Sequence, residues 1–525
     1  MRDFHFPGRS PVMATNGMCA TSTPLAAQVA VDILRQGGNA MDAAIAGSVL
    51  LGICEPASTG IGGDCFTLVS PAGSEEVFAY NGSGRAPAAA DAADLRARGL
   101  DAVPLFGVEA VTVPGAIDGF CTLSEKYGKL GIADSLAPVI HYAEEGIPVG
   151  PRSAFDWHQT QGNLQGHGRR HYLRDGKPLT KGDIFRAPGQ AEVLRRVSAQ
   201  GRDAFYTGEI AEDMVTTLRA MGGVHTMEDF AATAGNDATP IGGTYKSAEL
   251  LEHPPNGQGA TAILLLNILK HFDIASMDPF GIERTHIEAE AAKLAYDARD
   301  RLIADPDHTT RTAHMIAQET ADKLAALIDP KRAMAAPAPL TEAVHKDTVY
   351  LSVVDKDGMA VSMIYSIFHA FGSGIASDKF GILMQNRGGG FTLKEGHPNE
   401  LKGGKRPMHT IIPGMICRDG RVEMPFGVMG GHYQPNGHAR VLSNMEDFGM
   451  DPQTALDSPR SFVEDGELKL ERGYSDSVKQ ELADMGHKVV VPDMPIGGAQ
   501  AIRIHKNGVL EGASDPRKDG AAIGY

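Results

Sequence analysis

Residues 347–366 read DTVYLSVVDKDGMAVSMIYS, and this stretch decides the architecture of the second part of the chain. Two runs rich in β-branched and aromatic residues, 348–355 and 359–366, flank Lys356-Asp357-Gly358. Such a pair of runs around Asp-Gly predicts an antiparallel hairpin, because the tight turn needs positive φ at its central residues. The pattern recurs around Asp419-Gly420 and Asn507-Gly508, so the chain after residue 347 is predicted to form antiparallel sheet.

The first part of the chain reads mainly as helix. Residues 24–52 carry apolar side chains at helical spacing, and Gly37-Gly38-Asn39 ends one predicted helix and begins another with Asn39 as its N-cap. Residues 66–80 predict two strands around a Pro-Ala-Gly turn, whereas 105–330 are mostly helical. The amphipathic stretch 283–304 predicts one long helix. Together the two parts predict an α/β (α+β) protein whose sheet is covered by helices.

Residues 330–347 separate these two parts and read PKRAMAAPAPLTEAVHKD. The segment is rich in Ala and Pro and shows neither helical nor strand periodicity. This composition is typical of an exposed linker, and it lies directly before the strand that opens the first hairpin.

Charge and composition exclude several classes of partner. Lys and Arg number 49 against 65 Asp and Glu, so the net charge is −16, which opposes binding to nucleic acid phosphates. No apolar run is long enough to cross a membrane, and the N-terminal residues lack the apolar core of a signal peptide. We therefore expect a cytoplasmic protein with no membrane partner. The five cysteines form no C-x-x-C pair, so neither a disulfide framework nor a zinc site is expected.

Thr348 stands at the junction of linker and strand. Taken alone, a threonine at the start of a strand is ordinary. If the peptide bond between Asp347 and Thr348 is cut, however, the new α-amine lies beside the hydroxyl of the same residue. An α-amine has a pKa near 7.7–8.0, so part of it is neutral at pH 7 and can accept the hydroxyl proton. Nucleophile and base would then belong to one residue.

Two further features fit this chemistry. Gly430 and Gly431 follow a predicted strand, where backbone N–H groups without side-chain obstruction suit an oxyanion hole. A simple turn is the alternative interpretation. Ser366 ends the return strand of the first hairpin, where its hydroxyl can orient Thr348 or form only a local hydrogen bond.

These residues, with motifs spread over nearly the whole chain, resemble the γ-glutamyltranspeptidase family of N-terminal-nucleophile hydrolases. The resemblance is carried by five glycine- and proline-rich segments: Gly37–Ala44, Gly60–Gly63, His253–Gly259, Lys405–Met408 and Gly512–Arg517. It implies a four-layer αββα sandwich that is made as one precursor and cuts itself before Thr348. The products would be a large subunit, 1–347, and a small subunit, 348–525, that remain associated.

The resemblance also implies roles for individual residues. Thr348 matches the nucleophile, Ser366 matches a hydroxyl residue that orients it, and Gly430 and Gly431 match the oxyanion-hole glycines. No cofactor and no metal are implied. The partners would be a small-molecule amide substrate and water or an amine acceptor.

The chain departs from the family pattern where a glutamyl substrate would bind. The family's asparagine, its acidic residue and its pair of serines are replaced by Phe368, Gly390, and His409 with Thr410. Arg387 stands where the family has a glutamine, so an acid that would pair the substrate ammonium is missing and a cation lies nearby. Arg387 is our candidate for binding a substrate carboxylate; a structural arginine is the alternative.

Four other residues are weaker candidates for substrate binding. They are His409 and Thr410 after the Lys-Arg-Pro motif, Arg85, which is shifted by about two positions from the family's carboxylate-binding arginine, and Tyr433 beyond the glycine pair.

Three functions remain open on the sequence. The first is a hydrolase or transferase for γ-glutamyl amides of the glutathione kind. The second is a family member with another acyl specificity, such as an oxamate or glutaryl-type amidohydrolase, which an arginine without an acid partner favours. The third is a non-catalytic binding protein on the same fold, against which the retained Thr348, Ser366 and glycine pair argue.

Overall fold

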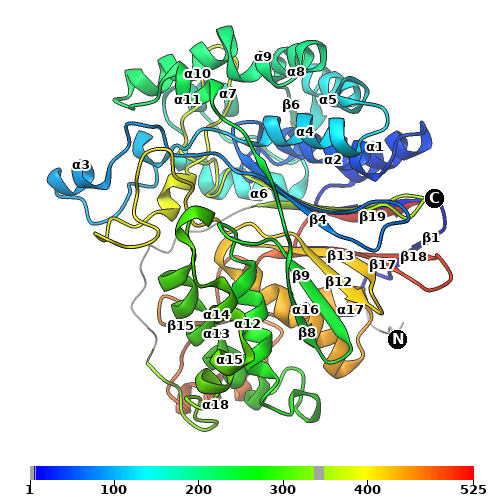
Figure 1. Cartoon of the computed structure of the whole chain (residues 1–525). Helices are drawn as coiled ribbons and strands as arrows, with labels where there is room; N and C mark the ends of the chain where they lie inside the picture. Colours follow the sequence, from blue (N-terminus) through cyan, green and yellow to red (C-terminus); the bar gives the residue numbers. More distant parts are fainter. Residues whose placement is uncertain (1–4, 6–7, 336–347) are drawn as a thin grey trace.

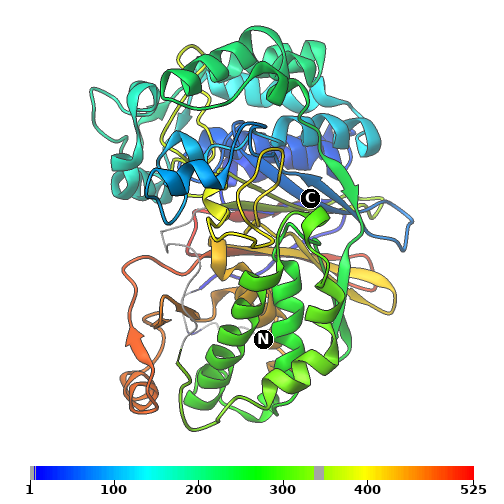
Figure 2. The ribbon, with the colours of Figure 1, turned by 60° about the vertical axis from the view of Figure 1, so that its left-hand side comes forward.

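The computed structural model describes residue 5 and residues 8–335 and 348–525. Figure 1 shows two β-sheets stacked face to face between two layers of helices. The view in Figure 2, turned by 60°, keeps the same four layers. The predicted αββα sandwich is therefore confirmed.

Sheet A, the lower of the two inner layers in Figure 1, has seven strands. Its order is β1 (Val12–Ala14), β18 (Leu510–Ser514), β17 (Gly498–Ile504), β13 (Arg421–Met429), β12 (Gly414–Arg418), β9 (Ala248–Glu252) and β8 (Ile241–Tyr245). The predicted hairpins at Asp419-Gly420 and Asn507-Gly508 are the β12–β13 and β17–β18 pairs of this sheet.

Sheet B also has seven strands and contains the hairpin predicted around Asp357-Gly358. Its order is β19 (Ala521–Gly524), β2 (Met18–Thr21), β10 (Val349–Val354), β11 (Ala360–Ser366), β3 (Asp64–Ser70), β4 (Phe78–Gly82) and β7 (Asn236–Ala238). Strands β10 and β11 are antiparallel and pair Val349 with Tyr365, as the Asp-Gly turn predicts. Because β2 and β3 flank them, strands from both sides of residue 347 interleave in one sheet.

The helices above sheet B come from the first part of the chain (Figure 1). Helix α2 (Ala40–Cys54) packs on β10 and β11, and all 15 of its residues are buried. Asn39 is its N-cap, as predicted, and forms a capping box with Asp42. The other helices of this layer are α1 (Pro24–Arg35), α4 (Ala116–Tyr127), α5 (Ile132–Glu145), α6 (Pro151–Thr160), α7 (Gly166–Tyr172), α8 (Pro188–Gln200), α9 (Asp203–Tyr206), α10 (Gly208–Ala220) and α11 (Met227–Ala231).

The opposite layer covers sheet A and combines helices from both parts of the chain. It contains the long helix predicted over 283–304, which runs as α13 (Ile282–Leu302). The other helices are α12 (Gly259–Leu269), α14 (Thr312–Ile316), α15 (Gln318–Ala325), α16 (Gln434–Phe448), α17 (Pro452–Asp457) and α18 (Asp476–Asp484).

Smaller elements lie outside these layers. Strands β14 (Ser461–Glu464), β15 (Glu467–Leu470) and β16 (Lys488–Val490) form a three-stranded sheet, and β5 (Ile147–Pro148) pairs with β6 (Ile184–Phe185). Helix α3 (Ala92–Ala97) packs against Phe391, Leu393 and Leu401. Among the described residues, no helix is both long enough and apolar enough to cross a membrane.

The two sheets approach each other closely where β10 crosses β13. Ser352 on β10 donates a hydrogen bond to the carbonyl oxygen of Pro425 at 3.1 Å. Two residues earlier, the ring of Tyr350 lies against Gly427, where an added Cβ would be 2.3 Å from Tyr350 Cε2. Side chains on one face of a strand recur every second residue. Continued by two residues on each strand, this series of contacts leads from Thr348 towards Met429, the last residue of β13.

This close approach predicts that Gly427 sets the spacing of the two sheets. Replacing Gly427 by Ala should push Tyr350 out of its position and lower the free energy of unfolding by about 1–3 kcal/mol. Urea denaturation measures the change. Gly162→Ala is the matched control, because an added Cβ at this position has no neighbour within 4 Å. Equal unfolding midpoints for the two variants would contradict the packing described here.

Candidate active site

Thr348 and Ser366 meet at one end of the central hairpin of sheet B. The Oγ1 of Thr348 lies 3.3 Å from the Oγ of Ser366, and both side chains are buried. The pairing of Val349 with Tyr365 brings these two residues opposite each other, because each stands one position further out on its strand. The structure thus brings the predicted nucleophile and its predicted orienting residue together. Asp347, on the other side of the predicted cleavage point, lies outside the described residues.

The hydroxyl oxygen of Ser366 accepts hydrogen bonds from two donors. Its Oγ accepts from the backbone N–H of Phe368 at 2.9 Å and from Nη2 of Arg387 at 3.3 Å. A hydroxyl has two lone pairs and one hydrogen. Besides accepting these two hydrogen bonds, the Ser366 hydroxyl lies within hydrogen-bond distance of Thr348 Oγ1, and either oxygen can be the donor.

Arg387 is the charged group of this cluster. It begins the short helix η5 (Arg387–Gly390), is fully buried, and donates from Nη1 to Thr410 Oγ1 at 2.8 Å. Its guanidinium lies 4.1 Å from the centre of the Phe368 ring, a cation–π contact. Burial lowers the pKa of Arg387 to about 9, and the Asp64 charge opposes this shift. Within the described ranges no carboxylate lies within 4 Å of it, and its Nε has no acceptor.

Phe368 holds its ring under Arg387 at a conformational cost. Its backbone φ is +81°, a region that bulky residues rarely adopt. Such a conformation costs on the order of 1–3 kcal/mol and persists only where surrounding contacts fix it. Here the N–H bond to Ser366 and the stacked guanidinium fix it. At the position where the family has an asparagine, this chain therefore has the Phe368 ring, which stacks on the Arg387 guanidinium.

Asp64 holds the segments of the site in place, a role that the sequence motifs did not assign to it. Its Oδ1 accepts from the backbone N–H groups of Gly84 and Gly115 at 2.9 and 3.0 Å and from Gln385 Nε2 at 2.9 Å. Its Oδ2 lies 3.1 Å from Nε2 of His409. Asp64 also pairs with Ser366 across β3 and β11. The one available signal was its place directly after Gly60–Gly63.

His409 is part of this scaffold. Because the Asp64 carboxylate only accepts, Nε2 of His409 carries its hydrogen. Burial, with a smaller contribution from the Arg387 charge, lowers the pKa of His409 to about 3, so the ring is neutral. The ring also packs against Phe66 at 4.7 Å. These contacts fix the position of His409 and thereby help to position its neighbour Thr410. The predicted contact of His409 with a substrate stays a prediction.

Gly430 and Gly431 follow β13 and are joined to the Arg387 side of the site by Gln258. Both glycines have positive φ, +114° and +59°, and a Cβ on Gly430 would lie 2.9 Å from Gly497 Cα, so a side chain does not fit. The Nε2 of Gln258 donates to the carbonyl oxygens of Gly431 at 2.9 Å and of Thr410 at 2.6 Å. Gln258 lies in the His253–Gly259 motif, but only the fold reveals its two partners.

Two other predicted residues make none of these contacts. Arg85 is partly exposed, forms an ion pair with Asp305 at 3.3 Å and donates to the carbonyl oxygen of Gly404. The Tyr433 ring packs edge-on against Phe462 at 5.4 Å, and burial raises the pKa of its hydroxyl to about 12. The hydrogen-bonded cluster therefore contains Thr348, Ser366, Arg387 and Thr410, but neither Arg85 nor Tyr433.

Comparison with known proteins identifies the class of this fold and site. The family model described as Gamma-glutamyltranspeptidase matches residues 26–525. The glutathione hydrolase-like YwrD proenzyme of Bacillus subtilis is 37% identical over 529 residues, which cover 98% of this chain and 99% of that protein. The oxamate amidohydrolase proenzyme of Klebsiella pneumoniae is 35% identical over 538 residues, which cover 98% of this chain and 99% of that protein. The solved structure of cephalosporin acylase from Bacillus halodurans superposes with a TM-score of 0.93 at 37% identity, covering 100% of this chain and 99% of that one.

The fold and the site thus define an N-terminal-nucleophile hydrolase. More specifically, the chain belongs to the gamma-glutamyltranspeptidase family and is an amidohydrolase and transferase of that type. The predicted family is confirmed.

Neutral His409 is expected to make folding depend on pH. The unfolded chain protonates this imidazole below a pKa of about 6.5, whereas the folded protein keeps it neutral down to about pH 3. The stability that neutral His409 contributes is present above pH 6.5 and is lost as the pH falls, by about 2 kcal/mol between pH 7 and pH 5. His409→Gln, whose amide can still donate to Asp64, should lose correspondingly less. Equal losses in urea-unfolding free energy for both proteins would mean that folded His409 is protonated at pH 5.

Proposed function

We propose that the chain is a self-processing amidohydrolase in which Thr348 is both the cleavage point and the nucleophile. In the precursor, Thr348 Oγ1 attacks the carbonyl carbon of Asp347, and the acyl group moves from nitrogen to oxygen. Water then hydrolyses this ester, which leaves a carboxylate on Asp347 and a free α-amine on Thr348. The hydroxyl of Ser366 supports this role, because at 3.3 Å from Thr348 Oγ1 it can hold the nucleophile in one rotamer.

In the mature enzyme the α-amine of Thr348 accepts the hydroxyl proton while Oγ1 attacks the substrate amide. The negative charge on the tetrahedral intermediate would be stabilised by backbone N–H groups of Gly430 and Gly431, at roughly 3 kcal/mol per donor. Collapse transfers the proton to the leaving amine and forms an ester on Thr348. Water, activated by the same amine, or an amine acceptor then releases the acyl group. The contacts between β10 and β13 support this assignment, because they lead from Thr348 towards the end of β13, which the two glycines follow.

For the acyl donor we infer a dicarboxylic monoamide, of the oxamate or glutaryl kind, whose free carboxylate pairs with Arg387. The observation that carries this inference is the buried guanidinium with no carboxylate within 4 Å in the described parts of the chain. An isolated buried charge is costly, and a substrate carboxylate would offset that cost through a bidentate pair. Thr410 and Phe368 hold the guanidinium in position for it.

A γ-glutamyl donor is the second candidate, favoured by the 32% identity to the glutathione hydrolase proenzyme of Escherichia coli. Such a donor carries an ammonium as well as a carboxylate. The nearest described acid, Asp64, already accepts from Gly84, Gly115, Gln385 and His409. We therefore expect γ-glutamyl donors to react more slowly than donors without an ammonium group.

The proposed subunits, 1–347 and 348–525, would remain associated after cleavage. Strands β10 and β11 of the second segment lie between β2 and β3 of the first, so separation would break hydrogen bonds along both edges of the hairpin. The shared core of sheet B and α2 adds buried apolar contacts across the same boundary.

Self-cleavage predicts that the purified protein contains two polypeptides, of 347 and 525 − 347 = 178 residues. Intact mass and N-terminal sequencing should place Thr348 first in the smaller one. Thr348→Ala should stay in one piece and lose amide hydrolysis, whereas Thr348→Ser should still split. Thr67→Ala, which removes another buried threonine hydroxyl of sheet B, is the control and should cleave normally. Hydrolysis by an unbroken chain would contradict the proposal.

Carboxylate binding by Arg387 predicts a selective kinetic loss. Arg387→Met should lower kcat/KM for a monoamide with a free carboxylate by about 100-fold, because a buried charge pair contributes about 2–5 kcal/mol. The methyl ester of the same substrate should be affected less, which separates carboxylate binding from a general disturbance of Ser366. Arg85→Met is assayed alongside. If Arg85→Met shows the selective loss and Arg387→Met does not, Arg85 is the carboxylate-binding residue and our assignment is wrong.

A further inference from the structure

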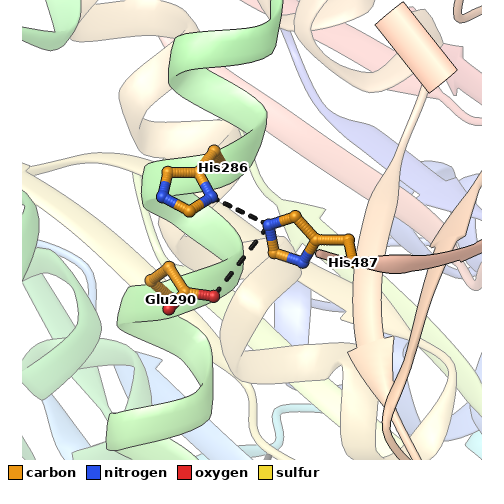
Figure 3. Close-up of side chains that lie close together, drawn as sticks. All are labelled: His286, Glu290 and His487. Atoms are coloured by element: carbon orange, nitrogen blue, oxygen red, sulfur yellow. Dashed lines mark hydrogen bonds and ion pairs between the residues drawn. The ribbon is translucent and has the colours of Figure 1, made fainter. Parts of the chain in front are cut away.

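A second polar cluster lies outside the candidate active site, where α13 meets the segment between α18 and β16. His286 and Glu290 stand four positions apart on one face of α13, and His487 approaches them from the second part of the chain (Figure 3). All three side chains are buried. Each offers one donor atom, and these atoms lie within 4.8 Å of one another.

The hydrogen bonds around His286 fix its chemistry. Its Nε2 lies 2.8 Å from the backbone carbonyl oxygen of Asp329, which only accepts, so Nε2 carries the hydrogen and Nδ1 carries a lone pair that can accept a hydrogen bond or bind an ion. A histidine that ligates a metal is commonly held this way, with its second nitrogen donating to a carbonyl or carboxylate. The lone pair of His286 Nδ1 points to His487 Nε2 at 2.8 Å, as the dashed line in Figure 3 shows.

The separations between donor atoms also fit an ion. His487 Nε2 lies 2.8 Å from His286 Nδ1 and 4.0 Å from Glu290 Oε1. Zinc bonds of about 2.0–2.1 Å in tetrahedral geometry place neighbouring ligand atoms about 3.4 Å apart, a value that these two distances bracket. Small side-chain rotations would equalise them. When an ion binds Nε2 of His487, the hydrogen on that ring moves to Nδ1.

We propose that His286 Nδ1, Glu290 Oε1 and His487 Nε2 form a binding site for one divalent transition-metal ion of the zinc type. Two imidazoles and one carboxylate are ligands that such ions prefer, and a water molecule completes a four-coordinate shell. The expectation that no metal is bound rested on cysteine spacing and on the family. It did not bear on ligands from positions 201 residues apart in the chain.

The ammonium group of Lys293 lies beside the proposed ion site and would repel a bound cation. Lys293 Nζ donates to Glu290 Oε1 at 2.7 Å and to the carbonyl oxygen of Met334 at 2.8 Å. An ion on Glu290 would displace the first contact and leave the ammonium on Met334 alone. The repulsion between the two cations weakens binding, so removal of the Lys293 charge should strengthen it.

The site joins the two parts of the chain near the end of the first. His286 and Glu290 precede the proposed cleavage point and His487 follows it. The same residues hold the chain between Asp329 and Met334, since Glu290 Oε2 accepts from the N–H of Met334 at 2.8 Å. An ion would therefore connect the proposed large and small subunits. This inference is independent of the proposed reaction, because it needs no contact with Thr348.

The test is titration of the chelator-stripped full chain with Zn²⁺ and Co²⁺, followed by competition with a chromogenic chelator and by the visible Co²⁺ spectrum. We expect one ion per chain. His487→Gln should weaken binding at least about 100-fold, whereas Lys293→Met should tighten it at least about tenfold. A gain in affinity cannot arise from misfolding. His505→Gln is the control, because that histidine follows β17 and pairs with Glu511, and its loss should leave binding unchanged. The Thr348→Ala chain should bind as the wild type does.

The proposal is overturned if neither the wild type nor Lys293→Met binds an ion stoichiometrically. It is equally overturned if His487→Gln binds like the wild type, because the ion would then lie elsewhere. A Lys293→Met protein that binds no more tightly would contradict the position of the ion on Glu290. None of these results depends on whether the chain cleaves itself or hydrolyses an amide.

Discussion

The buried carboxylate of Asp64 is the constraint on which the site depends. It accepts hydrogen bonds from two turns of the first part of the chain, at Gly84 and Gly115, and from two loops of the second part, at Gln385 and His409. A buried carboxylate is tolerated only when its lone pairs are satisfied, so these four segments are fixed relative to one another. Gln385 and His409 are close neighbours in sequence of Arg387 and Thr410, whose positions follow from this arrangement.

The same arrangement explains why a cation can stay buried beside the proposed nucleophile. Arg387 rests on the Phe368 ring and donates to the hydroxyls of Ser366 and Thr410, which are neutral acceptors. Neutral partners orient the guanidinium without cancelling its charge. The result is a preorganised positive group one hydroxyl away from Thr348 Oγ1, the type of environment that stabilises negative charge on a substrate.

Hydrogen-bonded side chains also connect the two sheets across the site. Gln258, from the start of α12, donates to both Thr410 and Gly431 and so links the loop that supports Arg387 to the glycine pair after β13. The Tyr350 ring lies against Gly427 where the two sheets meet. The position of Thr348 relative to the glycines therefore depends on packing between strands that are far apart in sequence.

The sequence by itself determined the local structure and nominated Thr348 and Ser366 as the proposed reacting pair. The Asp-Gly turn fixed the β10–β11 hairpin and hence the meeting of Thr348 with Ser366, because hairpin register is a short-range property of turn and strand pattern. Asn39 likewise identified the start of α2. Only the tertiary structure decided the rest. It showed that Asp64 and Gln258 each hydrogen-bond to several segments of the site. It also placed Arg387 in the cluster, whereas Arg85 pairs with Asp305. Finally, it brought together the side chains of His286, Glu290 and His487. These roles depend on burial and on partners from distant segments, and a linear pattern of residue types carries neither.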